Sequence, residues 1–474
     1  MLTKLEAEGF KNLLGLNVEF GPFTCIAGES GAGKSNVFDL IQLLSLLADR
    51  SLMEAAQEVR STRDERTGDP RDMFWNGHQR DNLQMYLAAE MIVPRHVEDD
   101  FGRPTSASIT FLRYELSIGY DPPHGLERQG RLLLLSESLR HINIGDAPRR
   151  LGFPHSPVHF RKNVITGRRS GQAFISTTGH DGDAVITVHQ DGGSRGQPRK
   201  ASAARAPATV VSTVTGADDP TILAARREMQ SWKRLALEPS ALRASDRYTD
   251  PQVMAPNGRH LAAALYRVAT SLSDDDPGEV RNVYARVASR LASLTDIRVR
   301  RVYVDPDDAR ELLTLKLVEA PGTEISARSL SEGTLRFLAL CVMREDPSVT
   351  GLVCMEEPEN GIHPANIRAM VELVRELAVD PQLAPGVDNP LRQVIVNTHS
   401  PAVVQLVEPD DLLFASVGRV SGPDGSRARG LRLRPITGSW RALRSEKEVA
   451  PVDKLDLLPY LSGPPEPLLS LAEG

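Results

Sequence analysis

The sequence predicts an α/β fold with a mixed central sheet and an inserted β-rich and helical region. Three observations support this. Strand and helix signals alternate over the first 48 residues, a glycine-rich loop at 28–35 lies between an apolar strand and an amphipathic helix, and the alternation returns after residue 330. A chain of 474 residues with 41% apolar composition is long enough for one large domain or two ordinary ones.

Hydrophobic periodicity predicts most elements. Residues 82–120 alternate like two antiparallel strands, whereas residues 277–294 carry apolar side chains at helical spacing. Residues 121–215 are rich in Gly, Arg, Ser and Pro, which indicates an insertion with some β structure (183–190) and a flexible linker. The other expected strands are 2–10, 16–20, 23–27, 296–304, 311–318, 351–355 and 393–399, with helices from 330 and over 364–378. We divide the chain into segments 1–120, 121–255, 256–415 and 416–474.

Composition excludes several classes of protein. The net charge of −6 provides no general basic field, so any contact with nucleic acid must be a local patch. Cys25, Cys341 and Cys354 lie in apolar surroundings without metal-ligand spacing, which is typical of reduced core residues. The N-terminus lacks the pattern of a signal peptide and no apolar run is long enough to span a bilayer. We therefore expect a cytoplasmic protein with no membrane contact.

The segment GESGAGKS fits the phosphate-binding P-loop, G-x-x-x-x-G-K-[ST]. Glycines let backbone N–H groups curl around phosphate oxygens where a Cβ would collide. Lys34 is expected to reach the β- and γ-phosphates and the Ser35 hydroxyl to bind Mg²⁺. The predicted nucleotide-binding residues of this segment are Gly28, Glu29, Ser30, Gly31, Ala32, Gly33, Lys34, Ser35 and Asn36.

Two further strands end in polar residues suited to triphosphate hydrolysis. The strand before MEEPEN ends in Glu356 and Glu357; we assign Glu356 to the magnesium side and Glu357 to the attacking water. The strand QVIVNTH ends in His399, at the edge of an α/β sheet where ligands bind, and this histidine is expected to donate to the γ-phosphate. A solvated acidic loop and a structural histidine are the ordinary alternatives.

The segment LSEGT predicts a helix whose start is suited to an anion. Ser331 is a good N-cap, and Gly333 leaves the first N–H groups of the helix accessible. Free N–H groups at a helix N-terminus bind anions. We therefore expect Ser331 and Gly333 to contact a phosphate.

The four motifs, in this order, resemble those of ATP-binding-cassette ATPase heads, a P-loop NTPase fold, and more narrowly the SMC, RecF and OLD-type branch. The segment LSEGT is similar to the signature LSGGQ, residues 359–361 to the loop after the acids, and His399 to the switch histidine. The resemblance covers roughly 1–120 and 255–415, which it makes the two ATPase lobes. It implies ATP and Mg²⁺ as cofactors, and two chains that enclose ATP, as a homodimer or a higher even oligomer.

Some residues fit the family pattern less closely. Glu356 stands where the family usually has an aspartate. Gln79 is a candidate for the lid glutamine on the metal side, with Gln84 as an alternative. GFKNL resembles the family's early basic element, so Lys11 and Asn12 are candidate nucleotide contacts.

By resemblance, we expect an ATPase that controls a separately encoded effector, such as a nuclease, in DNA maintenance or phage defence. A transporter subunit would have its P-loop and signature much closer together in a shorter domain. An intrinsic OLD-like nuclease would need paired acids at strand ends in the short tail, whose acids, such as Asp410, Asp411, Asp453 and Asp456, form no such cluster in the sequence and are otherwise solvated surface acids. A nucleotide-gated nucleic-acid-binding module would use the basic residues of the insertion, Arg149, Arg150, Arg161, Lys162, Arg168, Arg169, Arg199 and Lys200, which otherwise form a solvated loop.

Overall fold

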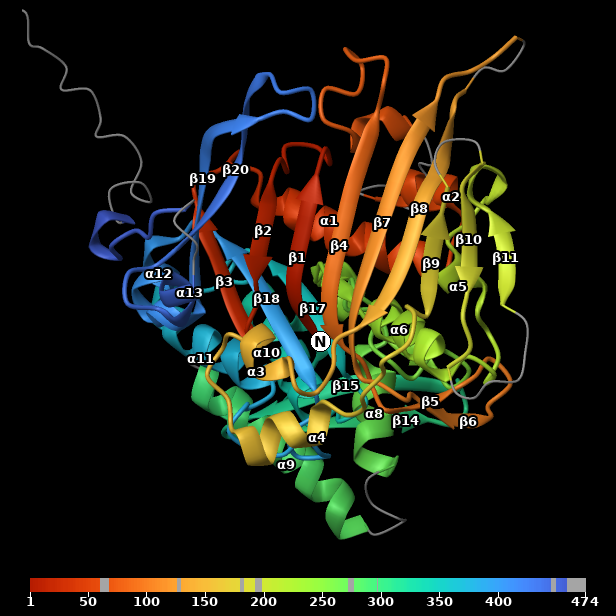
Figure 1. Ribbon diagram of the computed structural model, residues 1–474. Coiled ribbons are helices and arrows are strands. Elements are labelled where there is room, and N and C mark those ends of the chain that lie inside the picture. Colours follow the sequence, from red (N-terminus) through yellow and green to blue (C-terminus); the bar gives the residue numbers. More distant parts are fainter. Residues whose placement is uncertain are drawn as a thin grey trace, which may run out of the picture.

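Three larger β-sheets, one two-stranded sheet and the helices between them make up the described part of the protein (Figure 1). The computed structural model describes residues 1–59, 68–125, 129–179, 183–191, 198–271, 277–295, 297–444 and 449–457. Within these residues, no helix is both long and apolar enough to cross a bilayer.

The first sheet has eight antiparallel strands, and the long strands β4, β7 and β8 form its middle (Figure 1). Its spatial order is β11 (Arg199–Ser202), β10 (Val185–Val188), β9 (Ile175–Thr178), β8 (Arg131–His141), β7 (Phe111–Asp121), β4 (Gln84–Ile92), β1 (Leu2–Glu8) and β2 (Leu16–Glu19). One face of this sheet packs on α1 (Lys34–Leu47), α2 (Leu52–Glu58) and α6 (Pro220–Gln230) in a shared apolar core.

The second sheet has six strands, and three of its inner strands are buried on both faces. Its order is β12 (Lys233–Leu235), β17 (Gly351–Glu356), β18 (Arg392–Thr398), β3 (Phe23–Gly28), β19 (Leu412–Ser421) and β20 (Arg427–Pro435). Neighbouring strands are parallel except β19 and β20. Alternate residues of each strand face opposite cores: Ile26 and Ile395 pack with α1, whereas Cys25 and Val394 pack with the later helices.

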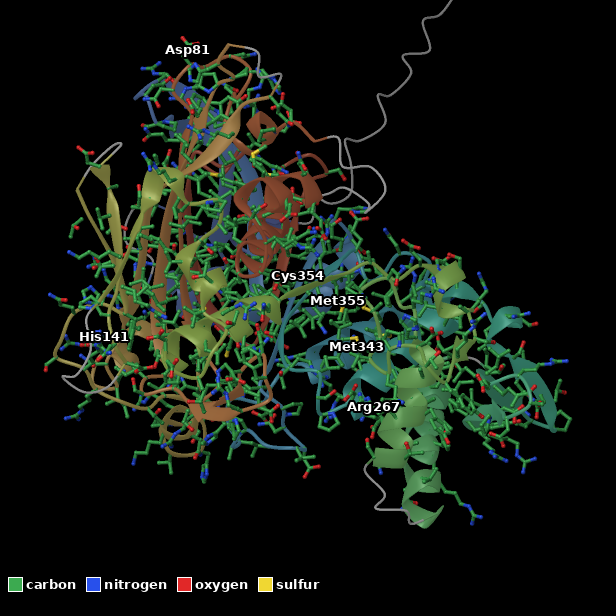
Figure 2. The ribbon with its side chains drawn as sticks, turned by 90° about the vertical axis from the view of Figure 1, so that its right-hand side faces the viewer. Asp81, His141, Arg267, Met343, Cys354 and Met355 are labelled. Atoms are coloured by element: carbon green, nitrogen blue, oxygen red, sulfur yellow. The ribbon has the colours of Figure 1, made fainter. Side chains whose placement is uncertain are left out.

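The second core connects the central sheet to a helical lobe, at lower right in Figure 2. Its helices are α8 (Leu261–Ser271), α9 (Pro277–Leu294), α10 (Glu332–Glu345), α11 (Ile367–Leu377) and α12 (Pro401–Leu406). The third sheet, β13 (Asp246–Arg247), β15 (Leu312–Glu319), β14 (Val299–Asp307) and β16 (Thr323–Ser326), packs beside α8 and α9. Figure 2 labels Cys354 and Met355 of β17, which point into the two different cores.

Smaller elements complete the chain. The strands β5 (His96–Glu98) and β6 (Pro104–Ser106) form a hairpin. The short helices α3 (Ala147–Arg150) and α4 (Lys162–Val164) cover a small apolar cluster that includes Phe153, Phe160 and Trp440. The remaining helices are α5 (Val210–Thr213), α7 (Pro239–Leu242) and α13 (Trp440–Arg444).

The predicted α/β class with a mixed central sheet is confirmed, but the predicted segment boundaries differ from the observed elements. Residue 120 lies inside β7 and residue 415 inside β19. The first half of the predicted insertion is not separate, because β8 to β11 extend the same sheet as β1. A composition shift marks exposed loops, whereas strand pairing is set by contacts distant in sequence. Of the predicted linker, residues 192–197 lie outside the described residues.

Candidate functional site

Three parallel strands carry the sequence motifs to one edge of the central sheet. Glu356 of β17 pairs with Asn397 of β18, and Thr398 pairs with Ala27 of β3. The strands therefore end side by side. The loop after β3, the acids after β17 and the histidine after β18 meet at this edge, where α/β folds bind ligands.

The loop 28–35 depends on glycine at two points of close approach. Gly28 has φ of 159°, and a Cβ there would lie 2.2 Å from the carbonyl oxygen of Ala415. Gly33, the N-cap of α1, has φ of 97°, and a Cβ would lie 2.1 Å from Asn12 Nδ2. A Cβ at position 28 would meet the backbone of Ala415, and one at position 33 would displace the Asn12 side chain, so glycine at both positions keeps the cradle of N–H groups open.

Lys34 is folded back onto the loop that precedes it. Its Nζ donates to the carbonyl oxygens of Gly28 at 2.7 Å and Glu29 at 2.8 Å. Burial lowers the pKa of Lys34, against the opposing charges of Glu357 and other nearby acids. Among the other predicted loop residues, Glu29, Ser30 and Gly31 are exposed, Gly33, Ser35 and Asn36 are half-buried, and Gly28 and Ala32 are buried.

The early basic element packs directly against this loop. Asn12 Nδ2 donates to the carbonyl oxygen of Ala32 at 3.3 Å, and Asn36 Nδ2 donates to Asn12 Oδ1 at 2.7 Å. Lys11 Nζ donates to the buried carboxylate of Asp39 at 2.8 Å. These contacts hold the early basic element against the loop and α1. Direct nucleotide contact by Lys11 and Asn12 stays a prediction.

Glu356 is engaged by an arginine that sequence analysis missed. Arg234 of β12 donates from Nη2 to Glu356 Oε1 at 2.9 Å and from Nη1 to Asp39 Oδ1 at 3.1 Å. Lys11, Asp39, Arg234 and Glu356 thus form one chain of ion pairs across α1 and two strands. No sequence signal identified Arg234, because it stands alone on a three-residue strand.

Glu357 and His399 are hydrogen-bonded to each other. The Nδ1 of His399 lies 2.7 Å from Glu357 Oε1, and Asn360 Nδ2 donates to Glu357 Oε2 at 2.7 Å. Burial alone would raise the pKa of Glu357, but these hydrogen bonds and the charge of Lys34 outweigh it and lower the pKa. Glu357 has φ of 44°, a strained conformation for a side-chain-bearing residue, and such strain clusters at functional sites.

A second acid nearby, Glu359, is 8% exposed. Thr398 donates from Oγ1 to Glu359 Oε1, and Glu359 Oε2 is buried without a partner among the described residues. Burial raises the pKa of Glu359. Its place in the loop after the acids was the only sequence signal for this residue.

The start of α10 lies against the loop after β17. Ser331 is exposed, and its Oγ accepts from the Thr334 N–H at 3.2 Å as an N-cap. A Cβ on Gly333 would lie 3.2 Å from the carbonyl oxygen of Gly361. A pocket of about 290 Å³ separates α10 from β12 and is lined by Arg234, Arg336, Glu356 and Glu357, among others. Within the described residues, no hydrogen bond joins Ser331 or Gly333 to the loop 28–35 of the same chain.

Among the described residues, the other predicted candidates make no hydrogen bond or ion pair with the loop 28–35. Gln79 is exposed in a turn, where its N–H donates to Asn76 O at 2.9 Å, and Gln84 begins β4 with an exposed side chain. Their roles stay predictions. In the tail, Asp410 Oδ1 accepts from the Trp440 N–H at 2.9 Å and Asp411 pairs with Arg375.

Several basic residues of the insertion also have partners within the chain. Arg150 pairs with Glu90 and Arg199 with Asp219. Arg169 donates to three backbone carbonyls and covers the ring of Phe174. These contacts favour structural roles for part of the basic set.

Comparison with known proteins identifies the family. Solved SMC heads align at low identity: a head bound to the C-winged helix domain of ScpA (14% identity, 91% of this chain and 98% of that chain, TM-score 0.42) and the Thermotoga maritima SMC head domain (12% identity, 92% and 98%, TM-score 0.34). No curated protein sequence matches the chain. Residues 136–405, more than half of the chain, match the family described as "AAA domain, putative AbiEii toxin, Type IV TA system". The chain therefore belongs to this family of AAA-type P-loop ATPases.

Proposed function

We propose that this protein binds and hydrolyses ATP at the loop 28–35 and that two copies pair around the bound nucleotides. The observation that carries the proposal is the shared edge of β3, β18 and β17, where a P-loop, a Glu–His pair and an accessible acid lie together. The family assignment supports nucleotide binding and the use of Mg²⁺.

The residues of the site fit a nucleotide with its metal ion. The glycines at 28 and 33 keep a cradle open that a Cβ would fill, and the N-terminus of α1 faces that cradle. Ser35 and Glu356 are the residues that would bind Mg²⁺, which neutralises phosphate charge when bound. To reach the phosphates, Lys34 has to leave the carbonyls of Gly28 and Glu29.

Glu357 is the proposed base for the attacking water. Its lowered pKa keeps it ionised near neutral pH, and Asn360 and His399 fix its orientation. A carboxylate in this state orients a water molecule and accepts its proton. His399 uses Nδ1 toward Glu357, so Nε2 remains to face a phosphate.

Pairing of two copies follows from the position of the signature. Ser331 is exposed at the start of α10, and each chain carries one P-loop and one such helix. A two-fold axis would let each chain offer its helix N-terminus to the γ-phosphate bound by the other. We extend the proposal, by resemblance alone, to a cytoplasmic location and to control of a separate effector in DNA maintenance or phage defence.

The test uses Glu357→Gln, with Glu372→Gln on the exposed face of α11 as the matched control. We expect Glu357→Gln to bind ATP, to lose hydrolysis and to accumulate as a dimer in light scattering, while Glu372→Gln behaves as the wild type. A Glu357→Gln protein that stays monomeric with ATP would contradict the assignment.

A second arm tests the shared site. Ser331→Arg should keep ATP binding but lose pairing and turnover, whereas Ser329→Arg, two positions earlier and also exposed, should retain both. Normal hydrolysis by Ser331→Arg would refute the role of α10 across an interface.

A further inference from the structure

Arg234 reaches the metal side of the candidate ATP site from β12, the strand at one end of the central sheet. It is paired with Cys354 of β17, and Glu356 lies two residues further along that strand. Because side chains alternate along a strand, Arg234 and Glu356 are on the same face of the sheet as Cys354, which packs in the core shared with α1. Both side chains therefore face α1, the helix that begins with Lys34 and Ser35.

The guanidinium group of Arg234 holds two carboxylates. Its Nη2 donates to Glu356 Oε1 at 2.9 Å, and its Nη1 donates to Asp39 Oδ1 at 3.1 Å. Asp39 follows Ser35 by four residues in α1, so the two side chains project from the same side of the helix, one turn apart. Arg234 thus fastens Glu356 to the helix that carries Ser35, the other residue proposed to bind Mg²⁺.

The contact with Arg234 leaves the second carboxylate oxygen of Glu356 available. Oε1 accepts from Arg234, whereas Oε2 makes no hydrogen bond or ion pair with the described residues and is not among their buried atoms without a partner. The side chain of Glu356 is 32% exposed, so ions can reach it. A carboxylate that is fixed through one oxygen offers the other to a metal ion in a defined orientation.

The charges around Glu356 do not exclude a metal ion. Two cations, Lys11 and Arg234, alternate with two carboxylates, Asp39 and Glu356, so the chain of ion pairs is neutral in sum. Asp39 is fully buried beside the guanidinium group and balances part of its charge. We therefore expect the orientation of Glu356, rather than repulsion between Arg234 and the metal ion, to dominate the effect of this arginine.

A glutamate needs such support more than an aspartate does. Its side chain has one more rotatable bond than the aspartate that similar ATPase heads usually carry at the position of Glu356, so fixing its carboxylate costs more conformational entropy. The contact with Arg234 orders the carboxylate as the protein folds. Less ordering then remains to be done when the metal ion binds.

We propose that Arg234 is a positioning residue, which fixes Glu356 against α1 and leaves Oε2 free to bind Mg²⁺ at the ATP site. This inference rests on the proposed function and deepens it, because it names the residue that sets the metal dependence of nucleotide binding. Arg234 acts through Glu356 and not on the nucleotide. Groups that orient a metal ligand in this way change metal affinity by roughly 10–100-fold.

The experiment measures the Kd of a fluorescent, non-hydrolysable ATP analogue in buffer with Mg²⁺ and in buffer with EDTA. In the wild type, Mg²⁺ should lower the Kd. Arg234→Gln should raise the Kd in Mg²⁺ at least tenfold and leave the Kd in EDTA within about twofold. Arg234→Lys keeps one charged donor and should lose less. Lys233→Gln is the matched control, since it removes a charge from the neighbouring residue of β12, on the opposite face of the sheet, and should behave as the wild type.

Three results would overturn the proposal. Equal losses in Mg²⁺ and EDTA would make Arg234 a general support of the fold, and tighter binding by Arg234→Gln in Mg²⁺ would make it a competitor of the metal ion. A wild type whose Kd does not depend on Mg²⁺ would leave Glu356 no metal to bind. Thermal melting checks the fold of Arg234→Gln; should it be unfolded, Arg234→Lys decides, and an unchanged Kd in Mg²⁺ would then overturn the proposal.

Failure of this inference is distinguishable from failure of the proposed function. If the wild type binds the analogue in neither buffer, the ATP site itself is wrong. If the wild type binds it with the help of Mg²⁺ and Arg234→Gln binds equally well, the ATP site stands and only the role of Arg234 is refuted.

Discussion

Asp39 is the residue whose removal we expect to destabilise the site most. Its carboxylate is fully buried (0% exposed) in α1 and accepts from Lys11 at 2.8 Å and from Arg234 at 3.1 Å. Asp39→Ala would leave both cations without this acceptor. Removing one partner of a buried pair costs about 3–5 kcal/mol. We expect the lower end, about 3 kcal/mol, since the side chains of Lys11 and Arg234 are 16% and 24% exposed and water can reach them.

Guanidinium unfolding followed by both fluorescence and far-UV circular dichroism measures this cost, provided that the two probes give coincident transitions. Asp49→Ala is the matched control, because Asp49 is 53% exposed and its ion-pair contact with Arg226 is long, at 3.5 Å. It should change stability by less than about 1 kcal/mol. If Asp39→Ala costs no more than Asp49→Ala, the ion-pair chain does not stabilise the site and the reasoning is refuted.

Two other predictions concern the loop and the large sheet. Gly33→Ala should weaken ATP binding at least tenfold in calorimetry, because its Cβ would displace the Asn12 side chain from its hydrogen bonds with Ala32 and Asn36. Gly31→Ala shares the positive φ but has no atom within 4 Å of its Cβ, so it should cost less, and equal losses would contradict the steric argument. Burial raises the pKa of Glu137 to about 7, so the folded state keeps a proton that the unfolded state releases above about 4.5. Stability should therefore fall as pH rises from about 4.5 to 7, by about 3 kcal/mol, and then level off. The urea midpoint of the wild type, minus that of Glu137→Gln, should decrease over this pH range. A difference that does not change with pH would contradict the raised pKa of Glu137.

Sequence patterns were informative wherever the chemistry is local. The P-loop, the acids after β17 and the histidine after β18 are each continuous segments that follow an apolar strand. The helix at 277–294 was predicted by its spacing, and its Val283, Val287 and Leu291 are buried. These assignments succeed because periodicity and glycine content act within a few residues. The resemblance to P-loop ATPase heads, which rested on the same segments, is confirmed at the level of the family.

The sequence alone thus determined the α/β class and the residues of the site motifs, because the geometry of each motif depends on residues that are neighbours in sequence. Only the tertiary structure decided that Arg234 connects Asp39 to Glu356, that Glu357 and His399 are hydrogen-bonded, and that β8 to β11 extend the first sheet. These features depend on strand order and register, which join residues far apart in the chain. No local pattern encodes such pairings, since the same strand is equally well formed beside several different neighbours.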